Sequence, residues 1–358
     1  MMKRLIGIIG GVILICVFVS SITVLAQETW REKIRKKWEE RRKQKTESSQ
    51  LKRSRSGLEG ESPKVPITWI TKSGSYGPGN YGRRFQYGGQ ERFYEIHVPI
   101  NYKSGIPMPV VLVLHGGGGN TSIMRDKTGM DDVSEQEGFI VAYPAGTNPK
   151  YTDRWLFWNA GRDREGVDDV GYFSKVLDDL PKYFSIDTKR IYATGISRGS
   201  RMCYRLASEL SNRIAAIGAV SGQRSITESI KPPIEAISII HFHGIKDTLA
   251  PFYGGQSKGL GRQQMILPSV EEIIQEWVKY NGCLPQPEVT RIGQARRLRY
   301  SGGRSNTEVV LWVLEDGGHT WPGGTVSRFE IRKGVGNINQ DISASKVMWE
   351  FFKQHPKE

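Results

Sequence analysis

The sequence is poor in cysteine, with 3 in 358 residues. One of these, Cys16, lies in an apolar N-terminal run, so Cys203 and Cys283 are the two left for a folded domain. They could form at most one disulfide bond after export, which excludes a disulfide-rich scaffold. Spacing along the chain does not show whether their Cα atoms approach closely enough for that bond.

Nucleotide, nucleic-acid and metal motifs are also missing. No Gly-Lys-Ser/Thr follows the glycine run 116–119, and no acidic residue stands at the distance expected for a ribose contact, which disfavours nucleotide binding. The acidic pair Asp168 and Asp169 lacks the ligand spacing of a calcium loop and suits helix capping. The net charge is +14, yet no nucleic-acid-binding motif is present. We expect no cofactor, no metal and no nucleic-acid partner.

The N-terminal part of the chain has the composition of an export signal followed by a spacer. A short basic start precedes an apolar run over 5–19, and small residues at Val24-Leu25-Ala26 favour cleavage after Ala26. We therefore expect a signal peptide over 1–26 and a secreted or periplasmic protein. The apolar run is long enough for an uncleaved membrane anchor to be the alternative.

A charged linker is expected over 27–66. Lys and Arg outnumber Glu by six between Glu28 and Lys64, and from Ser48 onward hydrophobic content falls to the level of a disordered segment. This basic linker could contact a membrane or cell wall weakly; the alternative is that it is a solvated spacer. The catalytic domain would then span 67–358, and we expect a monomer.

A Gly-x-Ser-x-Gly sequence stands between a predicted strand and a predicted helix. The run 190–193 is typical of a short buried strand, and 202–207 is typical of a helix. Between them, Gly195, Ser197 and Gly199 form the pattern of a nucleophile elbow. The residues that flank the serine must be small because the turn is tight. We predict that Ser197 is a nucleophile; the alternative is an ordinary turn with a capping serine.

A nucleophilic serine needs a histidine base, and in this architecture the chain order is Ser, then Asp or Glu, then His. Two of the six histidines, His319 and His355, follow a plausible acid. His355 is close to the terminus and is expected to be solvated. His319 follows a predicted strand and lies in the glycine-rich loop 316–324, from which it could reach the serine, so we predict that it is the base.

The acid should follow an earlier strand. Asp247 comes three residues after the predicted strand that ends at Gly244, where it could accept the Nδ1–H of His319. Asp316 is the competing acid, but its position three residues before His319 suits it better to shaping the turn. His241 and His243, on the strand itself, are expected to be hydrogen-bonded histidines near a sheet end, or one of them could line the pocket.

The glycine-rich run His115–Asn120 follows another predicted buried strand. Glycines leave their backbone N–H groups accessible, as an oxyanion hole requires. We predict that the N–H groups of Gly117 and Arg198 form this hole; a flexible or phosphate-binding loop is the alternative. Trp158 and Trp321 are predicted near the cleft as substrate-binding residues, although tryptophans more often belong to the core.

Strand and helix patterns alternate along most of the chain, which predicts a doubly wound, mostly parallel sheet with helices on both faces. The site would lie at the carboxyl ends of the strands. The segment 252–268 interrupts the alternation and is either a flap or a surface loop. Strands are expected near 84–86 and 92–98, which would form an antiparallel edge, and near 109–114, 139–143, 190–194, 215–220, 237–243 and 307–314; helices near 128–136, 168–183, 199–211, 269–280 and 343–354.

From about Arg92 to its end, the chain resembles the polyhydroxybutyrate depolymerase family of secreted esterases, which is related to feruloyl and acetylxylan esterases. The resemblance rests on six motifs in order, which occupy residues 114–120, 158–161, 167–171, 195–199, 243–247 and 318–324. It implies an α/β-hydrolase fold, no cofactor, and a triad in which Ser197 is the nucleophile, Asp247 the acid and His319 the base.

The chain departs from the family pattern at three places. Ser200 stands where the family commonly has glycine, and Arg198 puts a cation beside the nucleophile. The family often pairs the cysteine at the position of Cys283 with a second one, but 301–303 holds no cysteine. A serine esterase is the expected function, with a serine peptidase of the same fold or a non-catalytic binding protein as alternatives. The sequence does not distinguish polyester from feruloyl, acetyl or other carbohydrate esters.

Overall fold

The computed structural model describes residues 66–161, 166–224, 231–257, 265–327, 330–331 and 334–358. The signal or anchor expected over 1–26 lies outside the described residues, as does all but the last residue of the linker expected over 27–66, so both remain predictions. Among the residues that are described, none of the helices is both apolar and long enough to cross a membrane.

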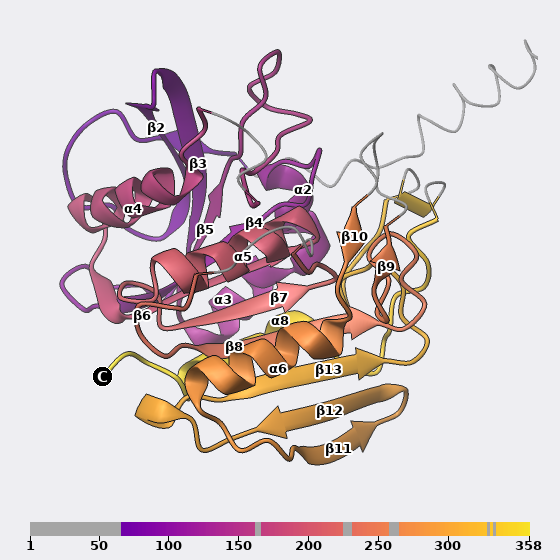
Figure 1. Cartoon of the computed structure of the whole chain (residues 1–358). Helices are drawn as coiled ribbons and strands as arrows, with labels where there is room; N and C mark the ends of the chain where they lie inside the picture. Colours follow the sequence, from indigo (N-terminus) through magenta and orange to yellow (C-terminus); the bar gives the residue numbers. More distant parts are fainter. Residues whose placement is uncertain (1–65, 162–165, 225–230, 258–264, 328–329, 332–333) are drawn as a thin grey trace, which may run out of the picture. The chain divides into compact units, whose positions relative to one another are not determined.

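The described part of the chain contains an eleven-stranded sheet in the order β1-β2-β3-β5-β4-β6-β7-β8-β13-β12-β11. The central strands from β5 to β13 run parallel, and antiparallel strands flank them on both sides (Figure 1). The strands are β1 Thr68–Trp69, β2 Gly79–Tyr87, β3 Gln90–Val98, β4 Met108–Leu114, β5 Ile140–Pro144, β6 Ile186–Ile196, β7 Ala216–Val220, β8 Ser238–Gly244, β11 Glu288–Ile292, β12 Ala295–Tyr300 and β13 Val309–Leu314.

Helices cover both faces of this sheet. Side chains of α4, α5 and α6 join one buried cluster, and side chains of α2, α3 and α8 join the other. Along β4, Val110, Leu112 and Leu114 face the first cluster while Val111 and Val113 face the second, because side chains alternate along a strand. The helices are α2 Thr121–Thr128, α3 Met130–Glu137, α4 Asp169–Asp179, α5 Arg198–Glu209, α6 Val270–Asn281 and α8 Ala344–Lys353.

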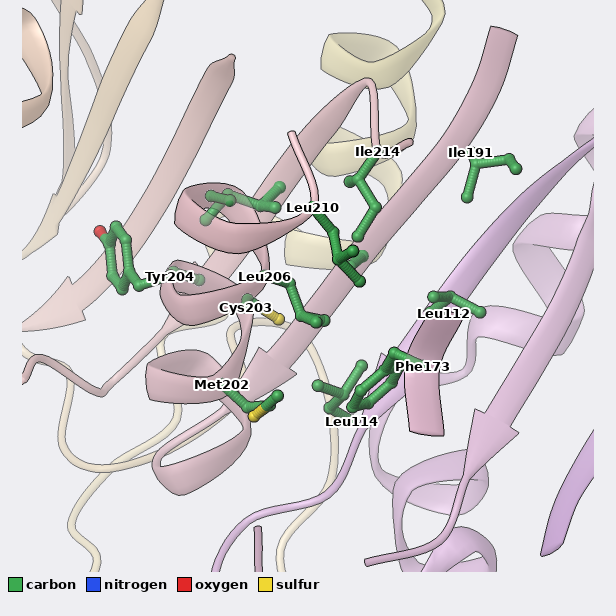
Figure 2. Packing of buried hydrophobic residues seen from close by; sticks show 14 of the residues in the cluster. Leu112, Leu114, Phe173, Ile191, Met202, Cys203, Tyr204, Leu206, Leu210 and Ile214 are labelled. Carbon is green, nitrogen blue, oxygen red and sulfur yellow. The ribbon is translucent and has the colours of Figure 1, made fainter. Parts of the chain in front are cut away.

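Helix α5 packs against the centre of the sheet. Figure 2 shows Leu206 of this helix and Leu210 just after its end, which share a buried cluster with Leu112 of β4, and Phe173 of α4 beside Leu114. Cys203 belongs to the same cluster and is a free, fully buried thiol. Cys283 is also free, so the possible bond between these two cysteines is absent from the structure.

The expected doubly wound α/β architecture is confirmed, including the antiparallel pair β2–β3 at one side. The helices differ from the expected ones in two places. The helix expected near 128–136 is α3, whereas α2 before it was not expected; Gly129, in the left-handed region with φ 56°, separates the two. The helix expected over 168–183 ends at Asp179, and a 3₁₀ turn with Pro181 follows, since proline cannot continue the α-helical hydrogen bonding.

The hairpin β11–β12 was not expected. Its strands carry Arg291, Arg296, Arg297 and Arg299, which interrupt the hydrophobic alternation that marks a half-buried strand. The segment suspected to be a flap, 252–268, contains two short paired strands, β9 Gly255–Gln256 and β10 Ile266–Leu267. Residues 258–264 between them lie outside the described residues.

Candidate active site

The site residues follow three strands of the parallel part of the sheet: β8 and β13 are neighbours, and β7 alone separates β6 from β8. Ser197 comes directly after β6, Asp247 follows β8, and His319 follows β13. Backbone hydrogen bonds continue past the strand ends: Ser197 N–H donates to Val220 O over 2.8 Å, and Ile245 N–H donates to Leu314 O over 2.9 Å. The carboxyl ends of these parallel strands therefore bring the three segments to one edge of the sheet, where ligands bind in open α/β folds.

Ser197 occupies a strained turn between β6 and α5. Its backbone has φ 58° and ψ −118°, which a residue with a side chain rarely adopts. A Cβ on Gly199 would lie 2.5 Å from Leu114 O, and one on Gly195 would lie 2.8 Å from the same oxygen. Both glycines are therefore required for the close packing of β6 and α5 on β4, as the sequence motif predicts.

Gly222 has a similar role that the sequence analysis missed. A Cβ there would collide with the carbonyl oxygen of Ser197 and lie 2.9 Å from Cβ of Ser200. Ser200, one of the departures from the family pattern, donates its hydroxyl to Gly222 O over 2.7 Å and so ties this turn to α5. The signal that could have found Gly222 is its place just after β7, at the same sheet edge.

His319 and Asp247 form a hydrogen-bonded pair. Nδ1 of His319 lies 2.8 Å from Oδ2 of Asp247, and both side chains are almost completely buried. A carboxylate can only accept, so Nδ1 carries the proton and Nε2 of a neutral His319 is left as the acceptor that a general base needs. In the described part of the chain, the Ser197 hydroxyl makes no hydrogen bond to this imidazole; such contacts are often long until substrate binds.

The environment of Asp247 keeps it ionised. Burial alone would raise its pKa, but the nearby His319 and hydrogen bonds from His243 and His319 outweigh burial and hold the pKa far below its usual range. Its Oδ1 also accepts the N–H groups of Leu249 and Ala250, over 2.9 and 2.8 Å. Asp316, the competing acid, instead accepts a hydrogen bond from Asn339 over 2.8 Å. The geometry therefore places Asp247, not Asp316, beside the imidazole.

In the part of the chain that the structure describes, the loop after β4 leaves the backbone N–H of Gly117 unpaired. The N–H of Gly118 donates to Leu156 O and that of Gly119 to Gly116 O, whereas the N–H of Gly117 has no protein partner among the described residues. The carbonyl of Gly116 is also held by Nδ1 of His115, over 2.8 Å. The C=O of Gly116 and the N–H of Gly117 belong to one trans peptide group and point in opposite directions. Because the C=O is held by hydrogen bonds within the loop, the N–H of Gly117 points away from it.

The loop after β4 lies against the turn that holds Ser197. A Cβ on Gly116 would lie 3.5 Å from Cβ of Ser197, and one on Gly117 would lie 3.6 Å from Cδ of Arg198. Arg198 is the first residue of α5, where the positive end of the helix dipole is concentrated. Its guanidinium donates from Nε to Trp158 O over 2.6 Å, so this cation is held to the loop that carries Trp158.

His115 is a structural histidine of the loop. Gly146 N–H donates to its Nε2 over 3.0 Å, so the proton sits on Nδ1, and burial lowers the pKa of the imidazole to about 4. Its ring stacks on Trp158 with centroids 4.7 Å apart. A neutral His115 can therefore hold the Gly116 carbonyl in place at any pH near neutrality.

Trp158 and Trp321 were predicted to bind substrate, and the structure contradicts this. Both side chains are fully buried. Trp158 donates from Nε1 to His115 O over 2.9 Å, and so supports the loop after β4 from the core side. Trp321 donates from Nε1 to Ser345 Oγ over 3.0 Å, in the cluster beneath α8. Neither ring is accessible to a substrate, because each packs on the core side of its loop.

Trp155 and Phe157 occupy the outer side of that segment. Leu156 and Trp158 are buried, while Trp155 is 51% exposed and Phe157 is partly exposed, in the alternation typical of an extended chain. A Cβ on Gly118 would lie 3.3 Å from the ring of Trp155, and one on Gly117 would lie 3.6 Å from the ring of Phe157. Trp155 also has φ 54°, a strained conformation for a tryptophan. The alternation of side-chain direction expected for an extended segment over 155–158 is the signal that could have identified Trp155 and Phe157 as the exposed aromatic residues.

Asp168 and Asp169 serve the capping and loop roles expected for them. Asp168 accepts the N–H of Gly171 over 2.9 Å at the start of α4. Asp169 pairs with Arg92 at 2.7 Å and accepts the N–H of Asn159 over 2.6 Å. Where the structure describes the chain, no group of three or more His, Cys, Asp or Glu side chains is arranged to hold a metal ion.

The fold and the arrangement of this sheet edge define an α/β-hydrolase. A comparison structure of a pOPH variant in complex with DMSO has the same fold, with a TM-score of 0.50, 14% identity and coverage of 82% of this chain and 90% of that one. Residues 94–250 match the family described as esterase PHB depolymerase. The resemblance seen in the motifs is thus confirmed over these residues, and the protein is a carboxylic ester hydrolase.

Curated relatives carry esterase names. NocK of Nocardia uniformis subsp. tsuyamanensis, assigned by its name to the esterases, is 27% identical over 74% of this chain and 79% of its own length. Feruloyl esterase D of Neurospora crassa is 24% identical over 74% of this chain and 83% of its own length. The bifunctional acetylxylan esterase/xylanase of Neocallimastix patriciarum is 30% identical over 44% of this chain, which spans 22% of that larger protein.

Proposed function

We propose that the protein is a secreted serine esterase that acts through a triad of Ser197, His319 and Asp247. The observation that carries the proposal is the 2.8 Å hydrogen bond from Nδ1 of His319 to Oδ2 of Asp247, at the sheet edge where Ser197 leaves its strained turn. That bond leaves Nε2 of His319 as a proton acceptor, which is what the weakly nucleophilic serine hydroxyl needs.

In the proposed reaction, Nε2 of His319 takes the proton of Ser197 as its Oγ attacks the ester carbonyl carbon. The backbone N–H groups of Gly117 and Arg198 donate to the oxyanion of the tetrahedral intermediate. The C–O bond to the alcohol then breaks, and the alcohol leaves with the proton from His319. Water repeats the sequence on the acyl-enzyme, releases the acid and restores the serine hydroxyl. Asp247 stays ionised throughout and stabilises the imidazolium.

For the substrate we propose an ester of a polyester or of a plant carbohydrate. The support is the family match and the relatives that are named as feruloyl and acetylxylan esterases. Secretion is supported by the signal-like composition of 1–26. The three named ester types differ in the acyl group next to the carbonyl, so a comparison of them at fixed salt identifies the substrate: polyhydroxybutyrate oligomers, methyl ferulate and acetylated xylan.

The triad is tested with Ser197→Ala. We expect wild type to hydrolyse p-nitrophenyl butyrate and to be labelled by a fluorophosphonate at Ser197, and the variant to lose both with its unfolding midpoint unchanged. Hydrolysis at the wild-type rate by Ser197→Ala would refute the mechanism. A wild-type protein that neither hydrolyses esters nor reacts with the probe would instead support a non-catalytic binding protein, and a preference for amides would support a peptidase.

A further inference from the structure

Three buried polar side chains outside the triad lie in a row behind Asp247. The hydroxyl of Tyr204 is 2.7 Å from Nδ1 of His241, and Nε2 of His241 is 3.0 Å from Nδ1 of His243. Nε2 of His243 is 2.7 Å from the carbonyl oxygen of Ala250. Both histidines are completely buried and Tyr204 is 1% exposed. Polar groups at this depth are costly unless each finds a partner, so the row is a built network.

The row has a direction, which the carbonyl at its end determines. The carbonyl of Ala250 can only accept, so Nε2 of His243 carries a proton. A neutral His243 then presents Nδ1 as an acceptor, to which His241 donates from its own Nε2. Nδ1 of His241 must in turn accept, and the hydroxyl of Tyr204 is its donor. All donors therefore point from Tyr204 toward the loop that follows β8.

One end of the row holds the loop that carries the acid. Nε2 of His243 lies 3.4 Å from Oδ2 of Asp247, the oxygen that also accepts the hydrogen bond from Nδ1 of His319. Ala250 is held from both sides, since its N–H donates to Oδ1 of Asp247 while its C=O accepts from His243. His243 thus closes the turn 247–250 and leaves the carboxylate few other orientations.

The other end belongs to the helix that carries the nucleophile. Tyr204 lies on α5, which begins at Arg198, directly after Ser197. Its ring stacks on Trp277 of α6, with centroids 5.8 Å apart, so the hydroxyl cannot turn away from His241 without repacking. The row connects α5 to the loop of Asp247 through the interior of the protein.

We propose that Tyr204, His241 and His243 form a directional buried relay that positions Asp247, and through it His319, relative to Ser197. The inference rests on the proposed function, in which Asp247 is the acid. These three are positioning residues, because none of them touches the reacting atoms. Small displacements of an acid–base pair reduce turnover strongly, whereas they affect the binding of a small ester little.

The test compares three relay variants in the full chain with p-nitrophenyl butyrate. Tyr204→Phe removes one hydroxyl and leaves Nδ1 of His241 without a donor, and we expect kcat to fall about tenfold at unchanged KM. His243→Phe removes the donor to Ala250 and Asp247, and we expect a fall of about 100-fold. His243→Gln restores an N–H at the position of Nε2 and should recover about tenfold of that loss.

The matched control is Tyr94→Phe. Tyr94 is a fully buried tyrosine whose hydroxyl donates to Asp179 over 3.1 Å, on strand β3 and away from the triad segments. Loss of the Tyr94 hydroxyl should lower the urea unfolding midpoint by about as much as Tyr204→Phe does. The kcat of Tyr94→Phe should remain that of the wild type. If Tyr204→Phe and His243→Phe kept wild-type kcat while their urea midpoints fell, the relay would be a purely structural network and the proposal would be overturned.

A second measurement does not depend on activity. In imidazole ¹⁵N spectra of the wild type, His241 and His243 should both appear as Nε2–H tautomers, and an Nδ1–H form of either would overturn the relay's direction. The low-field proton of His319 Nδ1 should be present in wild type and in Tyr94→Phe, and should weaken or move in Tyr204→Phe. A wild type with no esterase activity but with these spectra would reject the proposed function alone and leave the relay supported.

Discussion

The imidazole of His319 donates its Nδ1–H to Oδ2 of Asp247 over 2.8 Å, although 72 residues separate the two in the chain. Neighbouring parallel strands create this contact: β8 and β13 pair from Val309↔Ile239 to Leu314↔Gly244, so the loops that follow them start side by side. The pair fixes which nitrogen of His319 is protonated, and therefore whether the histidine can serve as a base.

Asp247→Asn should abolish most activity without unfolding the protein. The amide oxygen of asparagine can still accept from Leu249 and Ala250, which leaves the amide nitrogen facing Nδ1 of His319. His319 would then be protonated on Nε2 and unable to accept from Ser197. We expect kcat for p-nitrophenyl butyrate to fall about 10⁴-fold, a loss of the size seen when a triad histidine is held in the wrong tautomer.

The control for this change is Asp316→Asn, which alters the competing acid. Asp316 contacts Asn339 and not His319, so its variant should keep kcat within the same order of magnitude as wild type. The reverse result, in which Asp316→Asn loses activity and Asp247→Asn keeps it, would show that the acid has been assigned to the wrong residue.

Gly199→Ala should impair both stability and turnover. The new Cβ would lie 2.5 Å from Leu114 O and 2.7 Å from His115 O, so α5 would have to move away from β4 and from the loop that follows β4. We expect a loss of about 1–3 kcal/mol in the free energy of unfolding, as for other overpacked sites, despite the better helix propensity of alanine. Urea unfolding and kcat are measured on the same preparations.

Gly77→Ala is the matched control, because a Cβ at Gly77 meets no atom within 4 Å. It should behave as wild type in both measurements. Equal behaviour of the two alanine variants would mean that β4 and α5 do not pack as closely as the structure indicates.

The protein should lose stability as pH falls from about 6.5. Burial lowers the pKa of His115 to about 4, and burial followed by the nearby His243 lowers that of His241 well below its ordinary value. Between the ordinary histidine pKa of about 6.5 and these lower values, the unfolded chain binds protons that the folded chain does not. Stability therefore rises with pH in this window, and His115 alone accounts for about 2 kcal/mol between pH 7.5 and pH 5.

Urea unfolding at a series of pH values between 8 and about 3 checks this linkage. Below about pH 4 the contribution of His115 is exhausted, and the depressed pKa of Asp247 then adds a further loss as that carboxylate is protonated. An unfolding free energy that is flat or higher at pH 5 than at pH 7.5 would contradict the burial of neutral His115 and His241.

Trp155→Gly should affect esters with aromatic acyl groups selectively. Glycine adopts the φ of 54° without strain, so stability should change by less than about 1 kcal/mol, while the half-exposed ring against Gly118 is lost. We expect KM for methyl ferulate to rise about tenfold, since an aromatic contact contributes about 0.5–1.5 kcal/mol, and KM for p-nitrophenyl acetate to change less. Ile100→Ala, at a 77% exposed position on another surface, provides the control. The same KM change for both esters would exclude an aromatic subsite at Trp155.

The nucleophile turn and the central strands were predictable because their signals are local. Continuous hydrophobic runs such as Val110–Leu114 are typical of strands covered on both faces, and the glycines around Ser197 are demanded by the packing of one turn. The order of residues along the chain was also enough to select His319 and Asp247, the two side chains that the structure brings together.

The sequence did not show which tryptophan side chains are buried and which are exposed to solvent. Trp155 and Trp158 stand three residues apart in one aromatic segment, and which of them is buried depends on how that segment pairs with Gly119 and Thr147. The same holds for β11 and β12, whose arginines find carboxylate partners such as Glu288, Glu308 and Glu315 only after the chain has folded.

The sequence by itself determined the class of fold, the strained turn of Ser197 and the residue types available for acid–base chemistry, because these depend on hydrophobic periodicity and on the steric needs of single residues. The tertiary structure alone decided that His115 holds the Gly116 carbonyl and that Tyr204 reaches His241. Such contacts join distant segments across a packed interior, where orientation depends on the simultaneous burial of all neighbours and no local pattern records it.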